Sequence, residues 1–174
     1  MSPAALPVPA PVPEFLTPRV EAVRQAARAG RREESLALAR AISGELAESH
    51  GPLHPYTLHA LELVAFCAQL AGRPVAATEV SAQAAAGWQH LLTGEHRQVR
   101  RQACNTAAFW LTVSDSVQAV RTGTALRTLL RSVFGPDHPS TFFVERRLTA
   151  IAGRDREAAM QALRPSGPAL LVHP

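Results

Sequence analysis

The sequence predicts an all-α solenoid of helix-turn-helix repeats, and three observations predict it. A loop motif at residues 51–57 (GPLHPYT) returns at residues 135–141 (GPDHPST), with a shorter copy, GEHR, at residues 94–97 between them. The histidines of successive copies are 42 residues apart. The chain is rich in alanine and leucine and only 5% aromatic, which suits close-packed helices better than sheets. A fixed period of this size indicates stacked repeats that share one core.

Composition narrows the class of protein. The 174 residues, 47% of them hydrophobic, suffice for the core of one domain. All 18 basic residues are arginine, which suggests a GC-rich genome and a bacterial source, whereas their dispersion and a net charge of +4 do not favour nucleic-acid binding. We expect a cytoplasmic protein, because no apolar run approaches the roughly 20 residues of a membrane span, no signal peptide is recognisable, and two cysteines cannot form a disulfide framework.

The first elements follow from prolines, glycines and helical periodicity. Residues 1–14 are expected to be a disordered leader, because alternating prolines remove backbone donors there. A first helix begins near Phe15 and ends before Gly30, which is placed as a C-terminal stop. A second helix at about residues 32–49 presents one apolar stripe, formed by Leu38, Ile42 and Leu46.

The repeated loop motif is explained by helix boundaries and needs no ligand. Gly51 can adopt a left-handed conformation just past one helix, and Pro55 suits the first turn of the next. His54 then lies at or beside the N-cap. Because neighbouring helices pack about 8–10 Å apart, equivalent histidines of successive pairs should lie about 10–20 Å apart. Zinc requires its ligand atoms about 2.0–2.3 Å from one centre, so we expect capping histidines and no metal site.

The same plan places the remaining elements. Helices are expected at about residues 55–71, 74–93, 97–113, 116–134 and 139–152, followed by a short eighth helix at 155–163 that pairs with the seventh and caps the array. The apolar stripe returns in register at Val80, Ala84, Trp88, Leu126 and Leu130. The chain therefore divides into a leader at 1–14, a helical repeat domain at 15–164 and a C-terminal tail at 165–174.

The repeated loops, together with the stretch Asn105-Thr106-Ala107-Ala108-Phe109-Trp110 in the middle unit, resemble tetratricopeptide repeats of the kinesin light chain type. Units of that type often read as a GPDHPxT turn followed by a helix bearing NLAxxY. The resemblance covers about residues 15–164 and implies a right-handed α-solenoid of about three and a half to four TPR-like repeats. It also implies that the first helix of each pair lines a concave groove. Asn105 matches the asparagine that in this family often hydrogen-bonds a bound peptide.

The family register assigns the residues that face this groove. The candidates are Arg24, Arg28, His59, Glu62, Phe66, Gln69, Arg101, Cys104, Asn105, Phe143 and Arg146. Four arginines against Glu62 would attract carboxylates, because guanidinium groups bind them through two parallel hydrogen bonds. Our hypothesis is a partner segment with acidic residues or a free C-terminus. The alternative is that these arginines only solvate a helical face.

Catalysis has weaker support. Cys104, His59 and Glu62 could share the groove, but their spacing matches no catalytic arrangement, and there is no phosphate-binding loop, HExxH or GxSxG. We expect Cys67 and Cys104 to be packed thiols, and Trp88 and Trp110 to belong to the core. No catalytic residue, cofactor or metal is therefore predicted.

Three functions remain open after the sequence is read. The first is a protein-protein interaction module, acting as a scaffold or adaptor that binds a peptide segment in the groove. The second is a small enzyme or accessory subunit of a bacterial biosynthetic pathway that uses the groove as a substrate pocket. The third is a self-associating repeat protein, in which a terminal helix pair or the apolar tail at residues 169–172 contacts another copy.

Overall fold

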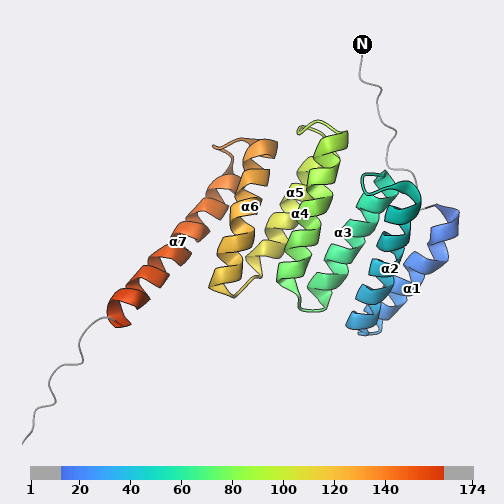
Figure 1. Ribbon diagram of the computed structural model, residues 1–174, viewed down its shortest axis with the longest axis horizontal. Coiled ribbons are helices and arrows are strands. Elements are labelled where there is room, and N and C mark those ends of the chain that lie inside the picture. The colour runs from blue at the N-terminus through green and yellow to red at the C-terminus, as the bar shows by residue number, and fades with distance from the viewer. Residues whose placement is uncertain (1–12, 163–174) are drawn as a thin grey trace, which may run out of the picture.

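The computed structural model describes residues 13–162 of the chain, and their side chains up to residue 154 (Figure 1). These residues form seven α-helices and one short 3-10 helix, with no strand among them. The elements are η1 Glu14–Leu16, α1 Thr17–Arg28, α2 Arg32–His50, α3 Pro55–Leu70, α4 Pro74–Leu91, α5 Arg97–Leu111, α6 Ser116–Phe134 and α7 Pro139–Ala162. The leader up to residue 12 and the tail from residue 165 lie outside the described residues.

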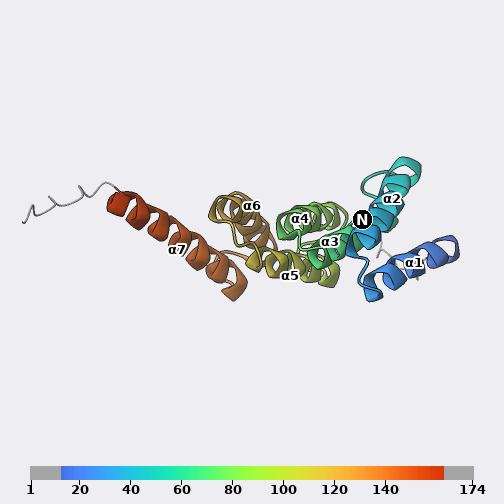
Figure 2. The same ribbon diagram turned by 90° about the horizontal axis from the view of Figure 1, so that it is seen from below.

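The helices form one elongated array of two staggered rows, and each helix runs antiparallel to the one before it (Figures 1 and 2). Seen from below, α1, α3, α5 and the start of α7 lie on one side of the array and α2, α4 and α6 on the other (Figure 2). We call the surface of α1, α3, α5 and α7 the odd-helix face. Three helix pairs and the single α7 make three and a half repeats, which confirms the predicted all-α solenoid. No helix among residues 13–162 is long and apolar enough to cross a membrane.

The three repeated histidines cap helices, as predicted. In each case imidazole Nδ1 accepts a hydrogen bond from the backbone N–H two residues later, at 3.2 Å for His54, 3.1 Å for His96 and 3.2 Å for His138. Each histidine thereby satisfies one of the N–H groups that the first turn of a helix leaves without a partner. The histidines stand at the N-termini of α3, α5 and α7.

The glycines and threonines of the two complete motifs close the same loops. Gly51 and Gly135 follow α2 and α6 with φ angles of 94° and 90°, which L side chains rarely adopt. Thr57 donates its hydroxyl to the carbonyl of Gly51 at 2.8 Å, and Thr141 donates to Gly135 at 2.9 Å. The motif at residues 51–57 and 135–141 is thus a structural connector between repeats.

The core lies between the helix rows and depends on two close approaches. Trp88 and Trp110 are 5% and 0% exposed, so the prediction that both are core residues is confirmed. A Cβ added to Gly87 of α4 would lie 2.4 Å from the Leu58 side chain of α3. A Cβ added to Gly123 of α6 would lie 2.6 Å from the Trp110 indole of α5. A large side chain of an odd helix thus packs on a glycine of the following even helix.

The expected turn near residue 153 is wrong, because α7 continues without interruption to Ala162. Gly30 and Gly72 end α1 and α3 with φ angles of 74° and 71° and are one 42-residue period apart. Two further periods after Gly72 stands Arg156, followed by Glu157, where the preceding repeat has Ser114 followed by the N-cap Asp115 that starts α6; the last repeat thus has neither a glycine stop nor a good N-cap residue. Gly153 precedes Arg156 by three residues and stays helical. The separate eighth helix is therefore absent from residues 139–162.

Candidate binding face

The structure places all eleven predicted site residues on α1, α3, α5 and α7, and none of them is buried. His59, Glu62 and Gln69 are half-buried, and the other eight are exposed. The 42-residue register aligns them in rows across neighbouring odd helices. One row contains His59, Arg101 and Phe143, and another contains Glu62, Cys104 and Arg146.

Glu62 connects three helices below the odd-helix face. Its Oε1 accepts hydrogen bonds from Trp88 Nε1 at 2.7 Å and Gln98 Nε2 at 2.6 Å. Its Oε2 accepts one from Arg101 at 3.1 Å. His59 lies 3.7 Å from Oε1 and packs edge-on against the Trp88 ring at a centroid distance of 5.0 Å. Both carboxylate oxygens are therefore engaged within the protein, and Arg101 is held in place on the face.

The positive charge of the face is smaller than the sequence suggested. Arg24 and Arg28 lie 3.7 and 3.4 Å from Glu21 on their own helix, a carboxylate that the sequence-based count of charges omitted. Arg101 is paired with Glu62 but its side chain stays 52% exposed. Arg146 is exposed and makes no ion pair with any side chain between residues 13 and 154. The charge left for a ligand is therefore centred on Arg146 and Arg101.

Apolar side chains stand on either side of this charge. Phe66 of α3 is 52% exposed and Phe143 of α7 is 54% exposed. Between them α5 presents the small exposed residues Cys104 and Ala108. The face thus carries an aromatic side chain on α3 and another on α7, separated by the small residues Cys104 and Ala108 of α5, and Arg146 lies on α7 beside them.

The expectation that Cys104 is a packed thiol is wrong, whereas Cys67 is buried as expected. The buried side of α5 is formed by Val99, Gln102, Ala103, Thr106 and Trp110. Cys104 follows Ala103 by one residue, a rotation of about 100° that turns it out of this stripe. Burial raises the pKa of the Cys67 thiol, and a hydrogen bond with Ser35 opposes part of that rise.

Gln69 and Asn105 differ in how far the protein uses them. Gln69 Nε2 donates to Thr112 Oγ1 at 3.0 Å, which ties α3 to the end of α5. Asn105 is exposed and donates to Gln102 Oε1 at 3.4 Å. Gln102 itself is buried and donates to Ser81 Oγ at 2.9 Å. The hydrogen bond to the buried Gln102 thus orients the Asn105 side chain, whose amide remains exposed to solvent.

Sequence reasoning missed Arg147, which stands one period after Asn105. Its guanidinium lies 4.4 Å from the Trp110 ring centroid and donates to the carbonyls of Trp110 at 2.8 Å and Val113 at 2.6 Å. These bonds satisfy carbonyls at the C-terminal end of α5 and fix α7 to it. Burial lowers the pKa of Arg147, with a further contribution from the charge of Arg154. The 42-residue register, which aligns Arg147 with Asn105, was the signal available in the sequence.

Metal ligands do not gather on this face or elsewhere in the described part of the chain. Among those residues, no three histidine, cysteine, aspartate or glutamate side chains come together in a geometry that could hold an ion. The histidines that share a register are instead used at separate helix N-termini.

Comparison with known proteins supports the fold. No family model and no curated protein matches the chain. Among solved structures, it is similar to a kinesin light chain-type protein of Podosopora anserina with nearly identical TPR-like repeats and to a single-substitution variant of that protein. The TM-score is 0.54 for both, the identities are 22% and 21%, and the alignments cover 91% of this chain and 82% and 81% of the others. Likeness at this identity shows the fold, and it confirms the predicted TPR-like repeat architecture.

Proposed function

We propose that this protein is an interaction module that holds a segment of another protein against its odd-helix face. The observation that carries the proposal is the combination of Phe66 and Phe143, each more than half exposed, with Arg146, whose charge finds no partner among the described side chains. Aromatic side chains, phenylalanine among them, and arginine are enriched in the buried cores of protein interfaces.

The ligand should combine a carboxylate with an apolar residue. Arg146 and Arg101 can each present two parallel N–H groups to a carboxylate, from a side chain or from a free C-terminus. Arg101 is already oriented by Glu62, so less side-chain entropy is lost when it binds. An apolar residue of the segment would pack on Phe143 or Phe66 and cover the strip formed by Cys104 and Ala108.

Asn105 supports an extended ligand. Its exposed side-chain amide has both a donor and an acceptor, which matches the N–H and C=O of a peptide bond. Held from below by Gln102, it can pair with the ligand backbone while neighbouring side chains select the sequence.

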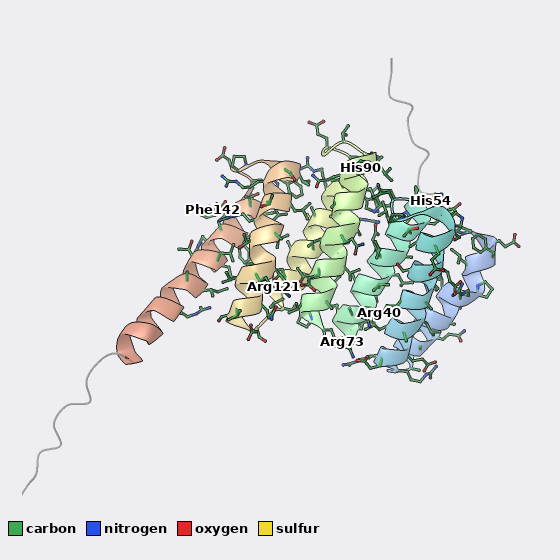
Figure 3. The ribbon with its side chains drawn as sticks, in the orientation of Figure 1. Arg40, His54, Arg73, His90, Arg121 and Phe142 are labelled. Atoms are coloured by element: carbon green, nitrogen blue, oxygen red, sulfur yellow. The ribbon has the colours of Figure 1, made fainter. Side chains whose placement is uncertain are left out.

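A matched pair of double variants tests the proposal. In Arg101→Glu/Arg146→Glu, one ion-paired and one unpaired arginine of the odd-helix face are reversed. In the control, Arg40→Glu/Arg121→Glu, the same is done on α2 and α6, since Arg121 pairs with Glu79 at 2.6 Å and Arg40 forms no ion pair with the described side chains (Figure 3). Net charge changes equally in both.

Binding is measured against a display library of random peptides with free C-termini. We expect the parent and the control to enrich peptides that carry Asp, Glu or a terminal carboxylate next to an apolar residue. The Arg101→Glu/Arg146→Glu variant should bind the enriched peptides at least about tenfold more weakly, the loss of about 1.4 kcal/mol expected of one charge-assisted hydrogen bond. Equal binding by both double variants, or enrichment of basic peptides, would refute the proposal.

A further inference from the structure

Three ring side chains meet at the connector between α2 and α3. His50 is the last residue of α2, His54 caps α3, and Tyr56 stands in the first turn of α3. The centroid of the His54 ring lies 4.8 Å from those of His50 and Tyr56, which are 6.0 Å from each other. His50 is exposed and the other two are half-buried, so this three-ring cluster reaches the surface. Figure 3 shows His54 at the edge of the array where α2 ends and α3 begins.

Capping of a helix by histidine does not require the other two rings. In the last connector Phe134 stands at the position of His50, and a serine stands at the position of Tyr56. The Arg100 guanidinium lies over the Phe134 ring, 5.0 Å from its centroid, so that ring is covered within the chain. In the first helix pair the position of Arg100 holds Leu16, which is buried in the core. Among residues 13–154, no equivalent guanidinium therefore covers the three-ring cluster.

The cluster also has two hydrogen-bond donors available to a ligand. His54 Nδ1 accepts from the backbone N–H of Tyr56, so the neutral imidazole carries its proton on Nε2. Neither this N–H nor the Tyr56 hydroxyl forms a hydrogen bond with another described residue. Both are open to solvent, since the one buried side-chain polar atom without a partner in the described part of the chain is Gln118 Oε1. The site thus combines ring surface with two accessible donors.

This combination suits a proline-rich segment. Such a segment adopts the polyproline II conformation, which has no internal hydrogen bonds, so its carbonyl groups are free to accept from donors such as these. Prolines pack on aromatic-lined sites, and little backbone entropy is lost because φ is already fixed. The leader has the required composition, since residues 4–12 (AALPVPAPV) include three prolines and no charged or polar side chain.

We propose that the three-ring cluster is the binding site of the chain's own proline-rich leader, and that residues 4–12 lie across it as a polyproline II segment. Prolines of the leader would pack on the rings of His50 and Tyr56. Its carbonyl groups would accept hydrogen bonds from His54 Nε2–H and the Tyr56 hydroxyl. The proposal concerns the connector edge of the array and is independent of ligand binding on the odd-helix face.

The described chain begins close enough for this contact. Pro13 is the N-cap of η1, and its carbonyl accepts from the Leu16 N–H at 2.8 Å. Leu16 belongs to the core cluster against which Tyr56 packs. Because α1 and α2 are antiparallel, the start of α1 and the end of α2 at His50 lie at the same end of the pair (Figure 1). The twelve residues before Pro13 would span about 37 Å as polyproline II, several times the 6.0 Å that separates the rings of His50 and Tyr56.

Attachment to the same chain favours the leader over other proline-rich segments. A segment on a short linker is present at an effective concentration of about 1 mM. For a site that binds the free peptide with a dissociation constant of about 0.1 mM, the leader would fill the site about ten times as often as it leaves the site empty. A proline-rich segment of another protein would then bind only by displacing the leader.

Tyr56 is the only tyrosine of the chain, so its ring signals in nuclear magnetic resonance report on this site alone. In the full-length protein we expect nuclear Overhauser contacts between the Tyr56 ring and residues 6–11. The contacts should disappear in the full-length variant Pro7→Ser/Pro9→Ser/Pro11→Ser, here called the leader variant, and the ring resonances should shift. The substitutions lie outside the helical array, so the variant keeps the folded site.

A synthetic peptide with the sequence of residues 1–12 is then titrated into the same proteins. It should bind the leader variant about tenfold more tightly than the parent, in which the attached leader competes. His50→Ala, made in the leader variant, should weaken this binding at least about fivefold because one ring contact is lost. His90→Ala in the same background is the matched control and should change it less than about twofold. His90 is likewise exposed in the last turn of an even helix at this edge (Figure 3).

Several results would overturn the inference. Identical Tyr56 ring resonances in the parent and the leader variant would show that the leader does not reach the cluster. Equal peptide affinity of the two proteins, or no binding by either, would show that the leader does not fill such a site. Contacts found only between differently labelled copies in a mixed sample would assign the leader to the site of a second chain. Equal losses in His50→Ala and His90→Ala would place the peptide elsewhere.

Discussion

Replacement of Gly123 by alanine tests whether the close approach of α6 to α5 determines the stability of the repeats. The new Cβ would lie 2.6 and 2.8 Å from Cζ2 and Cε2 of Trp110, and 2.9 Å from Leu148 Cδ2. Ordinary carbon contacts are about 3.5–4.0 Å, so the indole would have to withdraw by about 1 Å. Trp110 cannot do this freely, since it is fully buried, donates Nε1–H to Ala119 O at 2.9 Å and lies under the Arg147 guanidinium.

The magnitude follows from opposing effects. Overpacking of a core costs about 1–3 kcal/mol, and weakening of a buried hydrogen bond about 1 kcal/mol. Alanine regains up to about 1 kcal/mol of helix propensity. We therefore expect Gly123→Ala to lower the free energy of unfolding by about 2 kcal/mol, or Tm by about 4–8 °C for a chain of this size. Gly44→Ala, where the Cβ meets open space, should instead raise stability by up to about 1 kcal/mol.

Urea unfolding followed by both far-UV circular dichroism and tryptophan fluorescence measures the change, since coincident transitions are needed before a single free energy can be assigned to a repeat protein. In a Trp110→Leu background the clash with the indole is gone and only the flexible end of Leu148 remains at 2.9 Å, so Gly123→Ala should then be close to neutral. The two substitutions should thus be non-additive by about 2 kcal/mol, within the range of contacting residues. Equal effects of Gly123→Ala in both backgrounds, or stability matching Gly44→Ala, would refute the reasoning.

Four further predictions concern the capping histidines, Arg147 and the two cysteines. His54→Ala, His96→Ala and His138→Ala should each lower the free energy of unfolding by about 1 kcal/mol in urea melts, and asparagine should recover most of it, because its side chain can accept the same backbone N–H; equal losses for alanine and asparagine would contradict the capping role. Arg147→Met should cost about 2–3 kcal/mol in the same assay and Arg147→Lys should recover less than half, because one ammonium cannot stack on Trp110 and reach both carbonyls; full recovery by lysine would argue against this geometry. A thiol reagent should label Cys104 in the folded protein and Cys67 only after unfolding. Since burial raises the pKa of Cys67 in the folded state above its value of 9.0 in the unfolded chain, stability from this thiol is full below that pH and is lost as pH rises further; the alkaline fall in unfolding free energy should shrink in Cys67→Ala, and an unchanged fall would contradict it.

Local chemistry made most of the fold predictable. His54 at an N-cap, Gly51 at a helix end and Pro55 in a first turn each act within a few residues of the chain, so their residue types already specify the boundaries. The constant 42-residue period then predicted the equivalent boundaries in the other repeats. The prediction failed at the last repeat: Gly153 suggested a stop, it lies three residues before the position that the period assigns to a helix end, and α7 continues through both. A glycine or histidine marked a helix boundary only where it stood at the position that the 42-residue period assigns to one.

Contacts between repeats could not be predicted in the same way. The pairing of Glu62 with Trp88, Gln98 and Arg101 joins three helices, and its geometry depends on how they are rotated and spaced. Sequence reasoning placed Glu62 and Arg101 on the same face but treated them as independent charges. The apolar residues around Cys104 predicted a core position. Cys104 is nevertheless exposed, because it lies one residue after the buried Ala103 and therefore points about 100° away around the helix.

The contrast between Asn105 and Arg147 limits how much of the odd-helix face can recognise a ligand. These residues occupy equivalent positions on α5 and α7, and Leu63 occupies the same position on α3. Leu63 has no polar group, and Arg147 is committed to Trp110 and Val113 inside the protein. Among α3, α5 and α7, backbone recognition by this row would therefore occur at Asn105 alone.

For the proposed ligand, side-chain contacts on either side of Asn105 would have to supply the rest of the binding energy. With neighbouring odd helices about 10 Å apart, the distance from Phe66 on α3 to Phe143 on α7 is roughly 20 Å, or about six residues of extended chain. A ligand of this length, fixed at its middle by Asn105 and by an aromatic contact at each end, would place a carboxylate beside Arg146 only near its α7 end. The position of the acidic residue within the enriched peptides is therefore a sharper test of the binding mode than affinity.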